Sequence, residues 1–347
     1  MLENIQSLQT AVSSGIHYLT VSTGGIPDYR VTLTQAEVNQ LNSRPKARSD
    51  FYGGATSARA GDEIAFGQNL GYKPTGPSCS LGYWPPGPAC PSNQNAQLKL
   101  PTEPVPAATT HCSTSTNTIG LMLNGTSVFN WQDGQSYNSQ HVWNNLAPVF
   151  EQYDVDICQG HAQQQGNYHH HMFSACLQDL VDDTGNGHSP IYGFAADGYP
   201  IYGPYYMQGI LAKPSWVKRD YAAASASGCG SAGVRSCQLV DQYDLSKGTK
   251  TVTAGPTTSG NVTTQSGNTI AASSGIYFED YYYAASLAAM GGEYLDQHNG
   301  HNHDGLGYHY HITAELVAGK LQPLFPYQVG PTFYGKLPAA TFATCGQ

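Results

Sequence analysis

Charged side chains are scarce in this sequence of 347 residues, because Asp, Glu, Lys and Arg together make up only 11% of it. A typical soluble protein has about 25%. The 15 basic residues form no stripe that could neutralise a phosphate backbone, and the formal net charge is −9. Nucleic acid is therefore excluded as a partner. No apolar run approaches the ~20 residues that a helix needs to span a membrane.

Several catalytic and binding motifs are also missing. The sequence has no Gly-x-Ser-x-Gly elbow, no His-Glu-x-x-His pair and no P-loop, so the common hydrolase and kinase classes gain no support. It has no Cys-x-x-Cys, which argues against a cysteine zinc site. The first residues are polar and lack the basic and apolar regions of a signal peptide. We expect a mature chain from which an export signal has been removed.

Uncharged polar residues, 39 glycines and 24 tyrosines take the place of the charges, a composition typical of a β-rich extracellular protein. The eight cysteines favour disulfides and an oxidising compartment, although eight cysteines allow 105 pairings. Asn124 and Asn261 begin glycosylation sequons. The pairs that we expect from their positions are Cys79–Cys90, Cys112–Cys345, Cys158–Cys176 and Cys229–Cys237.

Two histidine-rich stretches, residues 156–171 and 296–311, align without a gap at a constant offset of 140 residues. We call them the first and second His blocks. The identities in register are Asp156 with Asp296, Gly160 with Gly300, His161 with His301, Tyr168 with Tyr308, His169 with His309, and His171 with His311. Chance rarely places six such identities in register, so we infer a diverged internal duplication.

Each block ends in Tyr-His-x-His, a pattern with a period of two residues. In a strand, both histidines then face one way, roughly 6–7 Å apart, and the tyrosines face the other. The third histidine lies eight residues earlier, across a Gly-containing loop that can fold back. Three neutral imidazoles suit zinc, copper, iron or nickel better than calcium or magnesium. The predicted metal ligands are His161, His169 and His171 in one trio, and His301, His309 and His311 in the other.

Other residues of the blocks are less regular. Asp156 and Asp296 are expected either to be oxygen ligands or to fix the tautomer of a ligating imidazole. His170, His298 and His303 fall outside the repeated trio. The alternative for every histidine here is simple packing in a half-buried sheet, but the repetition of the whole trio favours metal binding.

The paired pattern Gly-His-x7-Tyr-His-x-His resembles the YHYH domain family, which is named for that tetrapeptide. Residues 188–204, 120–125 and 325–327 are also similar to segments of that family, so the resemblance covers about residues 119–330. It implies little about activity, because the family is defined by a motif rather than by a reaction. The first block departs from the name, since His170 stands where the second tyrosine is expected.

A hairpin precedes each His block. Asn124-Gly125 and Asp197-Gly198 each lie between apolar runs, which predicts type I′ turns with φ > 0 at both central residues. The second half then needs an insertion around residues 207–280. Within it, residues 249–274 are rich in Thr, Ser and Gly, which predicts a flexible or exposed arm. The tyrosines of residues 277–283 either line a polymer groove or pack in a sheet.

We therefore expect a mainly β, sheet-rich single domain built from an internal duplication, with long Pro/Gly loops and few short helices. Residues 1–118 should supply a strand near 17–21, a short helix at 34–41 and disulfide-held loops over 43–110 that pack on the core. Residues 119–330 form the YHYH-like core, and residues 331–347 close the chain. Thr34 and Glu37 have the spacing of a capping box at the start of the helix.

Three hypotheses for function follow. The first is an exported metalloenzyme with zinc or copper in a His₃ site, acting on an extracellular polymer or small molecule, with Asp197 as acid/base or ligand. Turn chemistry alone is an equal explanation of Asp197. The second is a metal-stapled surface, adhesion or polymer-binding module without catalysis, which closed coordination by four ligands would favour. The third is a disulfide-held adhesin whose histidines only pack.

Overall fold

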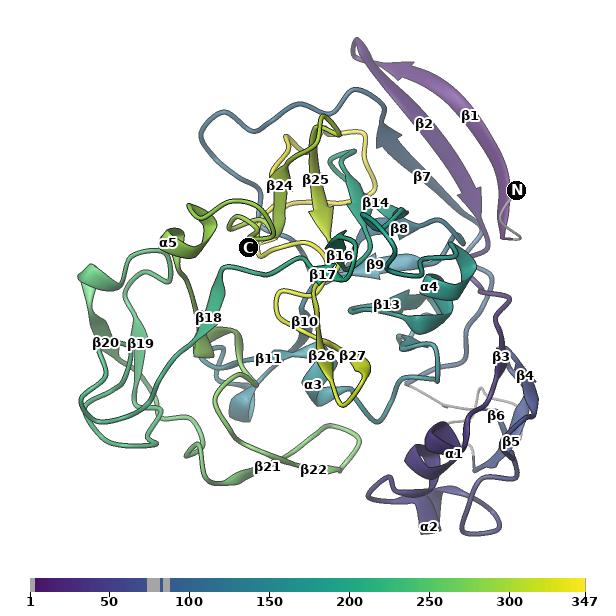
Figure 1. Ribbon diagram of the computed structural model, residues 1–347, viewed down its shortest axis with the longest axis horizontal. Helices are drawn as coiled ribbons and strands as arrows, with labels where there is room; N and C mark the ends of the chain where they lie inside the picture. The colour runs from purple at the N-terminus through teal and green to yellow at the C-terminus, as the bar shows by residue number, and fades with distance from the viewer. Residues whose placement is uncertain (1–3, 74–81, 84–87, 347) are drawn as a thin grey trace.

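A computed structural model describes residues 4–73, 82–83 and 88–346 of the chain (Figure 1). The fold is mainly β, as predicted, and its five α-helices are short. A central sheet of eight strands carries both His blocks. Its strands lie in the order β12 (Gly160–Ala162), β13 (Tyr168–His170), β9 (Ser127–Phe129), β8 (Thr118–Met122), β14 (Ile191–Ala195), β15 (Pro200–Tyr202), β25 (Tyr308–His311) and β24 (Gly300–Asn302).

This strand order is symmetric about its middle. Strands β8 and β14 form the antiparallel central pair, with Leu121 opposite Phe194. On one side of this pair the strands continue as β9, β13 and β12, and on the other side as β15, β25 and β24. In each half, the strand with the Tyr-His sequence (β13 or β25) runs parallel to the second strand of the hairpin (β9 or β15). The outermost strand carries the first histidine of the trio. The registers agree as well, because His170 pairs with Val128 in one half and Tyr310 pairs with Ile201 in the other. The two halves thus share the same strand order and register, as expected for an internal duplication.

The two hairpins also have the same turn, which differs from the predicted one. Only Gly125 (φ 84°) and Gly198 (φ 92°) have positive φ, while the residue before each glycine does not. Gly125 donates to the carbonyl of Met122, and Gly198 donates to that of Ala195. The loop is therefore a type I turn followed by a glycine in the left-handed region, one residue longer than the two-residue loop expected.

The two faces of the central sheet are covered differently. Met122, Val128 and Tyr310 belong to the largest apolar cluster, which fills one face. Leu121 and Phe194 point to the other face, where they pack against Val21 and Leu100 of the N-terminal sheet. Strand alternation and register place both His trios on this second face, at its two opposite edges.

The N-terminal region contains more regular structure than predicted. It has a three-stranded sheet, which Figure 1 shows beside the central sheet, rather than one strand. The predicted helix is present with its capping box on Thr34. Residues 43–110 include a helix and strands besides loops, because alternate apolar residues such as Ile64 and Leu70 pack in a core of their own. The elements are β1 (Ile5–Ser13), β2 (Ile16–Thr23), β3 (Arg30–Thr32), α1 (Gln35–Asn42), α2 (Ala47–Asp50), β4 (Glu63–Ala65), β5 (Asn69–Tyr72), β6 (Gly82–Tyr83) and β7 (Ala96–Pro101).

The insertion is structured and lies on the left of Figure 1. The Thr/Ser/Gly-rich stretch forms strand pairs whose outward residues are exposed, but Val262 and Ile270 are buried against Trp143. The tyrosines at 277 and 281 are buried too, so they pack and do not line a groove. The elements from here are β16 (Tyr205–Met207), β17 (Ile210–Leu211), β18 (Trp216–Lys218), β19 (Cys237–Leu239), β20 (Thr249–Thr251), β21 (Asn261–Thr263), β22 (Thr269–Ala271), β23 (Tyr281–Tyr283), α5 (Ala285–Ala288), β26 (Ala314–Val317) and β27 (Lys320–Pro323).

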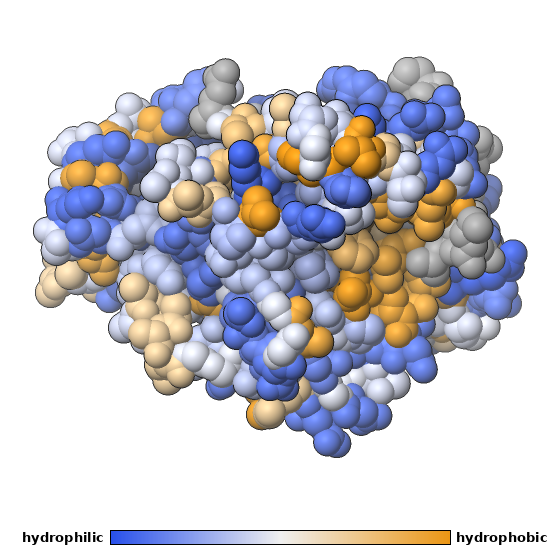
Figure 2. Space-filling model, turned by 90° about the horizontal axis from the view of Figure 1, so that it is seen from above, coloured by the Kyte–Doolittle hydropathy of each residue, from blue (hydrophilic) through white to orange (hydrophobic). Residues whose placement is uncertain are grey.

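Three of the expected disulfides are present, and Cys79 of the fourth lies outside the described residues. The bonded pairs are Cys112–Cys345, Cys158–Cys176 and Cys229–Cys237. None of the helices in the described ranges is long and apolar enough to cross a membrane. Hydrophilic residues cover most of the face shown in Figure 2, although few residues of the chain are charged.

One of the two sequons is buried. The Asn124 side chain is 5% exposed and donates to the hydroxyl of Tyr29, so the folded chain leaves no room there for a glycan. Asn261 is exposed and stays a predicted acceptor.

Candidate metal centres

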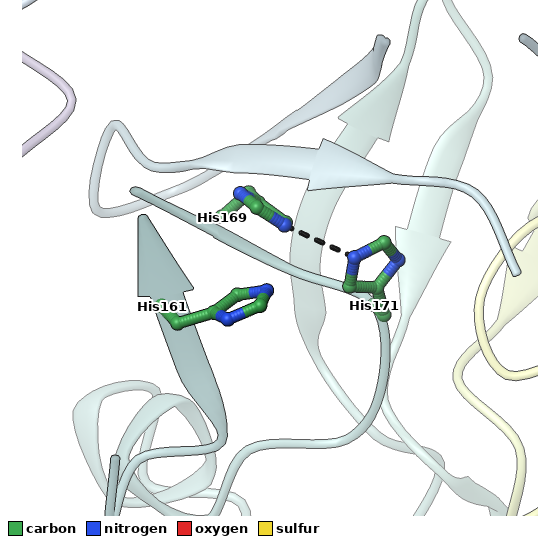
Figure 3. A group of neighbouring side chains, drawn as sticks. All are labelled: His161, His169 and His171. Atoms are coloured by element: carbon green, nitrogen blue, oxygen red, sulfur yellow. Dashed lines mark hydrogen bonds between the residues drawn. The ribbon is translucent and has the colours of Figure 1, made fainter. Parts of the chain in front are cut away.

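The first trio forms a compact group that we call centre 1 (Figure 3). His161 on β12 lies directly opposite His169 on β13, and His171 follows the end of β13. All three are buried, and one nitrogen of each lies within 4.8 Å of the others. The Nε2 atoms of His169 and His171 are 3.0 Å apart. The sequence pattern therefore predicted this group correctly.

Backbone contacts orient two of these rings. The Nδ1 atom of His169 lies 3.0 Å from the carbonyl oxygen of Asn167, and Nδ1 of His171 is paired with that of Asn130. Phe129 stacks on His169 with ring centroids 3.8 Å apart. A hydrogen bond from Nδ1 fixes the tautomer that leaves the lone pair on Nε2, as in known metal-ligating histidines.

A fourth residue of centre 1, Glu151, was not predicted from the sequence. It follows α3 (Ala147–Phe150), and its Oε2 atom lies 3.3 Å from Nε2 of His161 and 3.2 Å from Nε2 of His171. At the repeat offset its position corresponds to Gly291, so the comparison of the two blocks contains no signal for it. Centre 1 thus offers three imidazoles and one carboxylate.

The charges of centre 1 are strongly coupled. Burial alone would raise the pKa of Glu151, but His161 and His171 hold it well below its ordinary value. Burial lowers the pKa of His161, and Glu151 more than offsets that effect and raises it. Burial and the two neighbouring rings lower the pKa of His169 far below its usual range. The carboxylate is therefore ionised at neutral pH, which is the form that binds a cation.

The second trio forms centre 2, at the other edge of the sheet. His301 lies opposite His309, and one nitrogen of each lies within 4.8 Å of a nitrogen of His311. Each ring pairs its Nδ1 atom with a backbone carbonyl, at 3.1, 2.8 and 2.7 Å for residues 301, 309 and 311. The three Nε2 atoms are buried and have no hydrogen-bond partner.

Two further imidazoles approach centre 2. His188 and His303 form a second potential ligand group with His309. The ring of His188 lies 5.3 Å from that of His309 and pairs its Nδ1 with the carbonyl of Ser189 at 2.8 Å. The repeat contains no signal for His188, because at the offset of 73 residues between the two hairpins (Gly120 to Gly193) its counterpart is Ser115, which is not a ligand type. Centre 2 therefore gathers five imidazoles.

The three imidazoles of the trio in centre 2 are held in the neutral form. Burial and neighbouring rings lower the pKa of His301 to about 3, and burial lowers that of His309 to about 4. Burial and His301 also lower the pKa of His311 well below its ordinary value. Neutral rings with fixed tautomers are the form in which histidine binds metals.

The two aspartates of the blocks have other partners than the imidazoles. Asp156 accepts from the amide of Gly160 and from the hydroxyl of Tyr168 at 2.7 Å. Asp296 repeats this with Gly300 and Tyr308. Burial raises the pKa of both to about 6. These contacts hold the backbone just before the first histidine of each trio.

Asp197 lies on the opposite face of the sheet from both centres. It is fully buried and accepts from the hydroxyl of Tyr310 at 2.5 Å and from the amide of Gly335 at 2.8 Å. Burial raises its pKa to about 6. This environment favours the structural explanation of Asp197 over the acid/base one.

The centres are separate sites. Strands β13 and β25 are five positions apart in the sheet order, which at about 4.8 Å per strand separates them by roughly 20–25 Å. No ligand can therefore be shared between the two trios.

Comparison with known proteins gives one match. The family model described as YHYH protein matches residues 97–290, which is more than half of the chain. The match starts earlier than residue 119 and ends before the second His block, so it spans centre 1, both hairpins and the whole insertion. No curated protein and no solved structure matches the chain.

Proposed function

Because this chain belongs to the YHYH protein family and its two His blocks bring imidazoles together at both centres, we propose that it is an exported protein that binds transition-metal ions at centres 1 and 2. One observation carries the proposal. In both trios, the rings of the Tyr-His strand pair Nδ1 with backbone carbonyls and turn Nε2 towards a common point. Simple packing in a sheet does not explain why several nitrogen lone pairs point to one place.

Zinc or copper fits these ligands best, because both favour imidazole nitrogen. The three disulfides support export, since such bonds persist in oxidising compartments. When bound, an ion would supply Lewis-acid or redox chemistry. The protein's part is to hold neutral imidazoles and the Glu151 carboxylate around it.

The test is elemental analysis of the full chain beside His169→Ala and His309→Ala. The intact protein should bind metal at both centres, and each variant should lose the ion of its own centre only. His17→Ala, at an exposed position of β2, is the control and should retain all metal. Full metal content in both trio variants would refute the proposal.

A non-catalytic role is the second candidate, and Glu151 favours it. Three imidazoles and a carboxylate complete the four ligands of a tetrahedral zinc ion and so close the site. Pulsed EPR of the copper-loaded protein in heavy water discriminates the two roles. An exchangeable water ligand on the ion of centre 1 indicates a catalytic site, and the absence of such a ligand indicates a structural metal site.

A further inference from the structure

A polar cavity of about 350 Å³ reaches centre 1, and Glu151 and His161 are part of its lining. Oε2 of Glu151 and both ring nitrogens of His161 are buried and have no hydrogen-bond partner, although the Glu151 side chain as a whole is 23% exposed. This volume is within the range of ligand pockets, roughly 300–1,000 Å³.

Three distant parts of the chain enclose this cavity, which we call the centre-1 cavity. The N-terminal region contributes Arg44, Lys46, Asp50 and Tyr72. The core contributes Asp133, Phe150, Glu151, Tyr153 and Asp154. The turn between β21 and β22 in the insertion contributes Gln265, Ser266 and Asn268. Its lining therefore depends on the insertion as well as on the first His block.

The two cations in the lining are engaged by backbone. The guanidinium of Arg44 donates to the carbonyl of Tyr153 at 2.6 Å and to that of Val155 at 3.2 Å. The ammonium of Lys46 donates to the carbonyl of Ser266 at 2.8 Å. Because both side chains already donate hydrogen bonds to backbone carbonyls, they add little to the binding free energy of an anionic ligand.

Four carboxylates share the lining with these two cations, namely Asp50, Asp133, Glu151 and Asp154. A divalent ion at centre 1 would bring the formal charge of this set to zero. With this set formally neutral, its net charge favours neither an anionic nor a cationic ligand, and each would meet groups of its own sign. Carboxylates and side-chain amides accept hydrogen bonds from hydroxyl groups without a charge on the ligand.

We propose that the centre-1 cavity binds a neutral, hydroxyl-rich molecule of one or two sugar units beside the metal ion. The tyrosines at positions 72 and 153 add ring surface to a lining otherwise rich in hydrogen-bonding groups. The proposal deepens the proposed function and rests on it, because the charge of the ion completes the balance. A terminal unit of an extracellular polysaccharide and a free sugar share this chemistry.

The experiment compares three probes with the same carbon skeleton but different charge: glucose, gluconate and glucosamine. Saturation-transfer NMR titrations use the full zinc-loaded chain, and zinc is measured in the same samples. Glucose should bind at least tenfold more tightly than either charged probe. Stronger binding of gluconate or glucosamine, or binding of none of the three, overturns the inference.

Two variants locate the binding. Asp154→Asn removes one negative charge from the lining and should shift the preference towards gluconate, while Gln265→Ala, on an exposed turn that tolerates change, should weaken glucose binding several-fold. Asp182→Asn, an exposed aspartate away from the cavity, should behave like the intact chain. Unchanged binding in both cavity variants overturns the inference.

Metal content separates this inference from the proposed function. Zinc at centre 1 without sugar binding leaves the metal proposal standing and removes the cavity inference. A chain that binds glucose without zinc at centre 1 removes the metal proposal for that centre. His169→Ala, which lacks the ion, should prefer glucosamine because the lining is then negative. To separate a polymer end from a free sugar, a reduced oligosaccharide is compared with glucose.

Discussion

The Glu151 carboxylate is the one charged group of centre 1, and its Oε2 atom is within 3.3 Å of two imidazoles. Glu151→Gln keeps the shape but removes the charge, so we expect the zinc affinity of centre 1 to fall by about 10–100-fold. Competition with a coloured chelator measures this. Glu315→Gln, an exposed glutamate on β26, is the matched control. An unchanged affinity of centre 1 would show that Glu151 is only a neighbour of the ion.

Glu279 is a buried carboxyl outside both centres, and it accepts from the amide and side chain of Asn144 at 2.7 and 2.6 Å. Burial raises its pKa to about 8 from 4.5. Between these pH values the unfolded chain loses the proton and the folded chain keeps it. Its contribution to stability is therefore full below pH 4.5 and is lost as the pH rises through about 8.

Glu279→Gln cannot ionise, so this loss should be absent in the variant. We therefore expect the variant to gain about 1–2 kcal/mol in stability relative to the intact chain between pH 5 and pH 8, seen as a larger free energy of unfolding. Urea denaturation at both pH values measures it. A difference between the two proteins that does not change with pH contradicts the prediction.

At the scale of elements, one glycine precedes the first histidine of each trio. A Cβ atom on Gly300 would lie 2.5 Å from the carbonyl oxygen of His309, and one on Gly160 would meet the ring of Tyr168. Gly300→Ala should therefore force β24 away from β25, with a loss of about 1–3 kcal/mol in stability and weaker metal binding at centre 2. Thermal unfolding and metal content are the measurements.

Gly53→Ala is the control for this substitution, because nothing lies within 4 Å of the added atom and its φ is ordinary. It should leave both stability and metal content unchanged. Equal effects of the two substitutions would indicate a general cost of removing glycine and not a close approach of the two strands.

Elements with local or repeated signals were predictable. The capping box of α1, both hairpins and both His trios follow from spacing along one strand or turn, or from the agreement of the two blocks. Glu151 and His188 were not predictable as ligands, because each lies outside the aligned blocks and tertiary contacts bring it to its centre. The order of the Thr/Ser/Gly-rich stretch was missed for a similar reason, since a few widely spaced apolar residues such as Val262, Ile270 and Ala272 anchor it.

Across the whole molecule, the two centres offer different ligands. Centre 1 includes a carboxylate, whereas the potential ligand groups of centre 2 contain only imidazoles. All-imidazole sites favour copper over harder divalent ions. With one equivalent of Cu(II), we expect EPR to show nitrogen couplings from centre 2, and His309→Ala should abolish that signal. His169→Ala should keep it, and the reverse pattern would assign copper to centre 1.

The pairing of Leu121 with Phe194 places an approximate twofold axis at the seam between β8 and β14. An isologous contact of this kind is how two identical subunits meet in a homodimer. We infer that the chain arose by duplication and fusion of a subunit that once formed a homodimer. After the fusion, each half could acquire substitutions independently of the other. That freedom accounts for a glutamate beside one His trio and two added histidines beside the other.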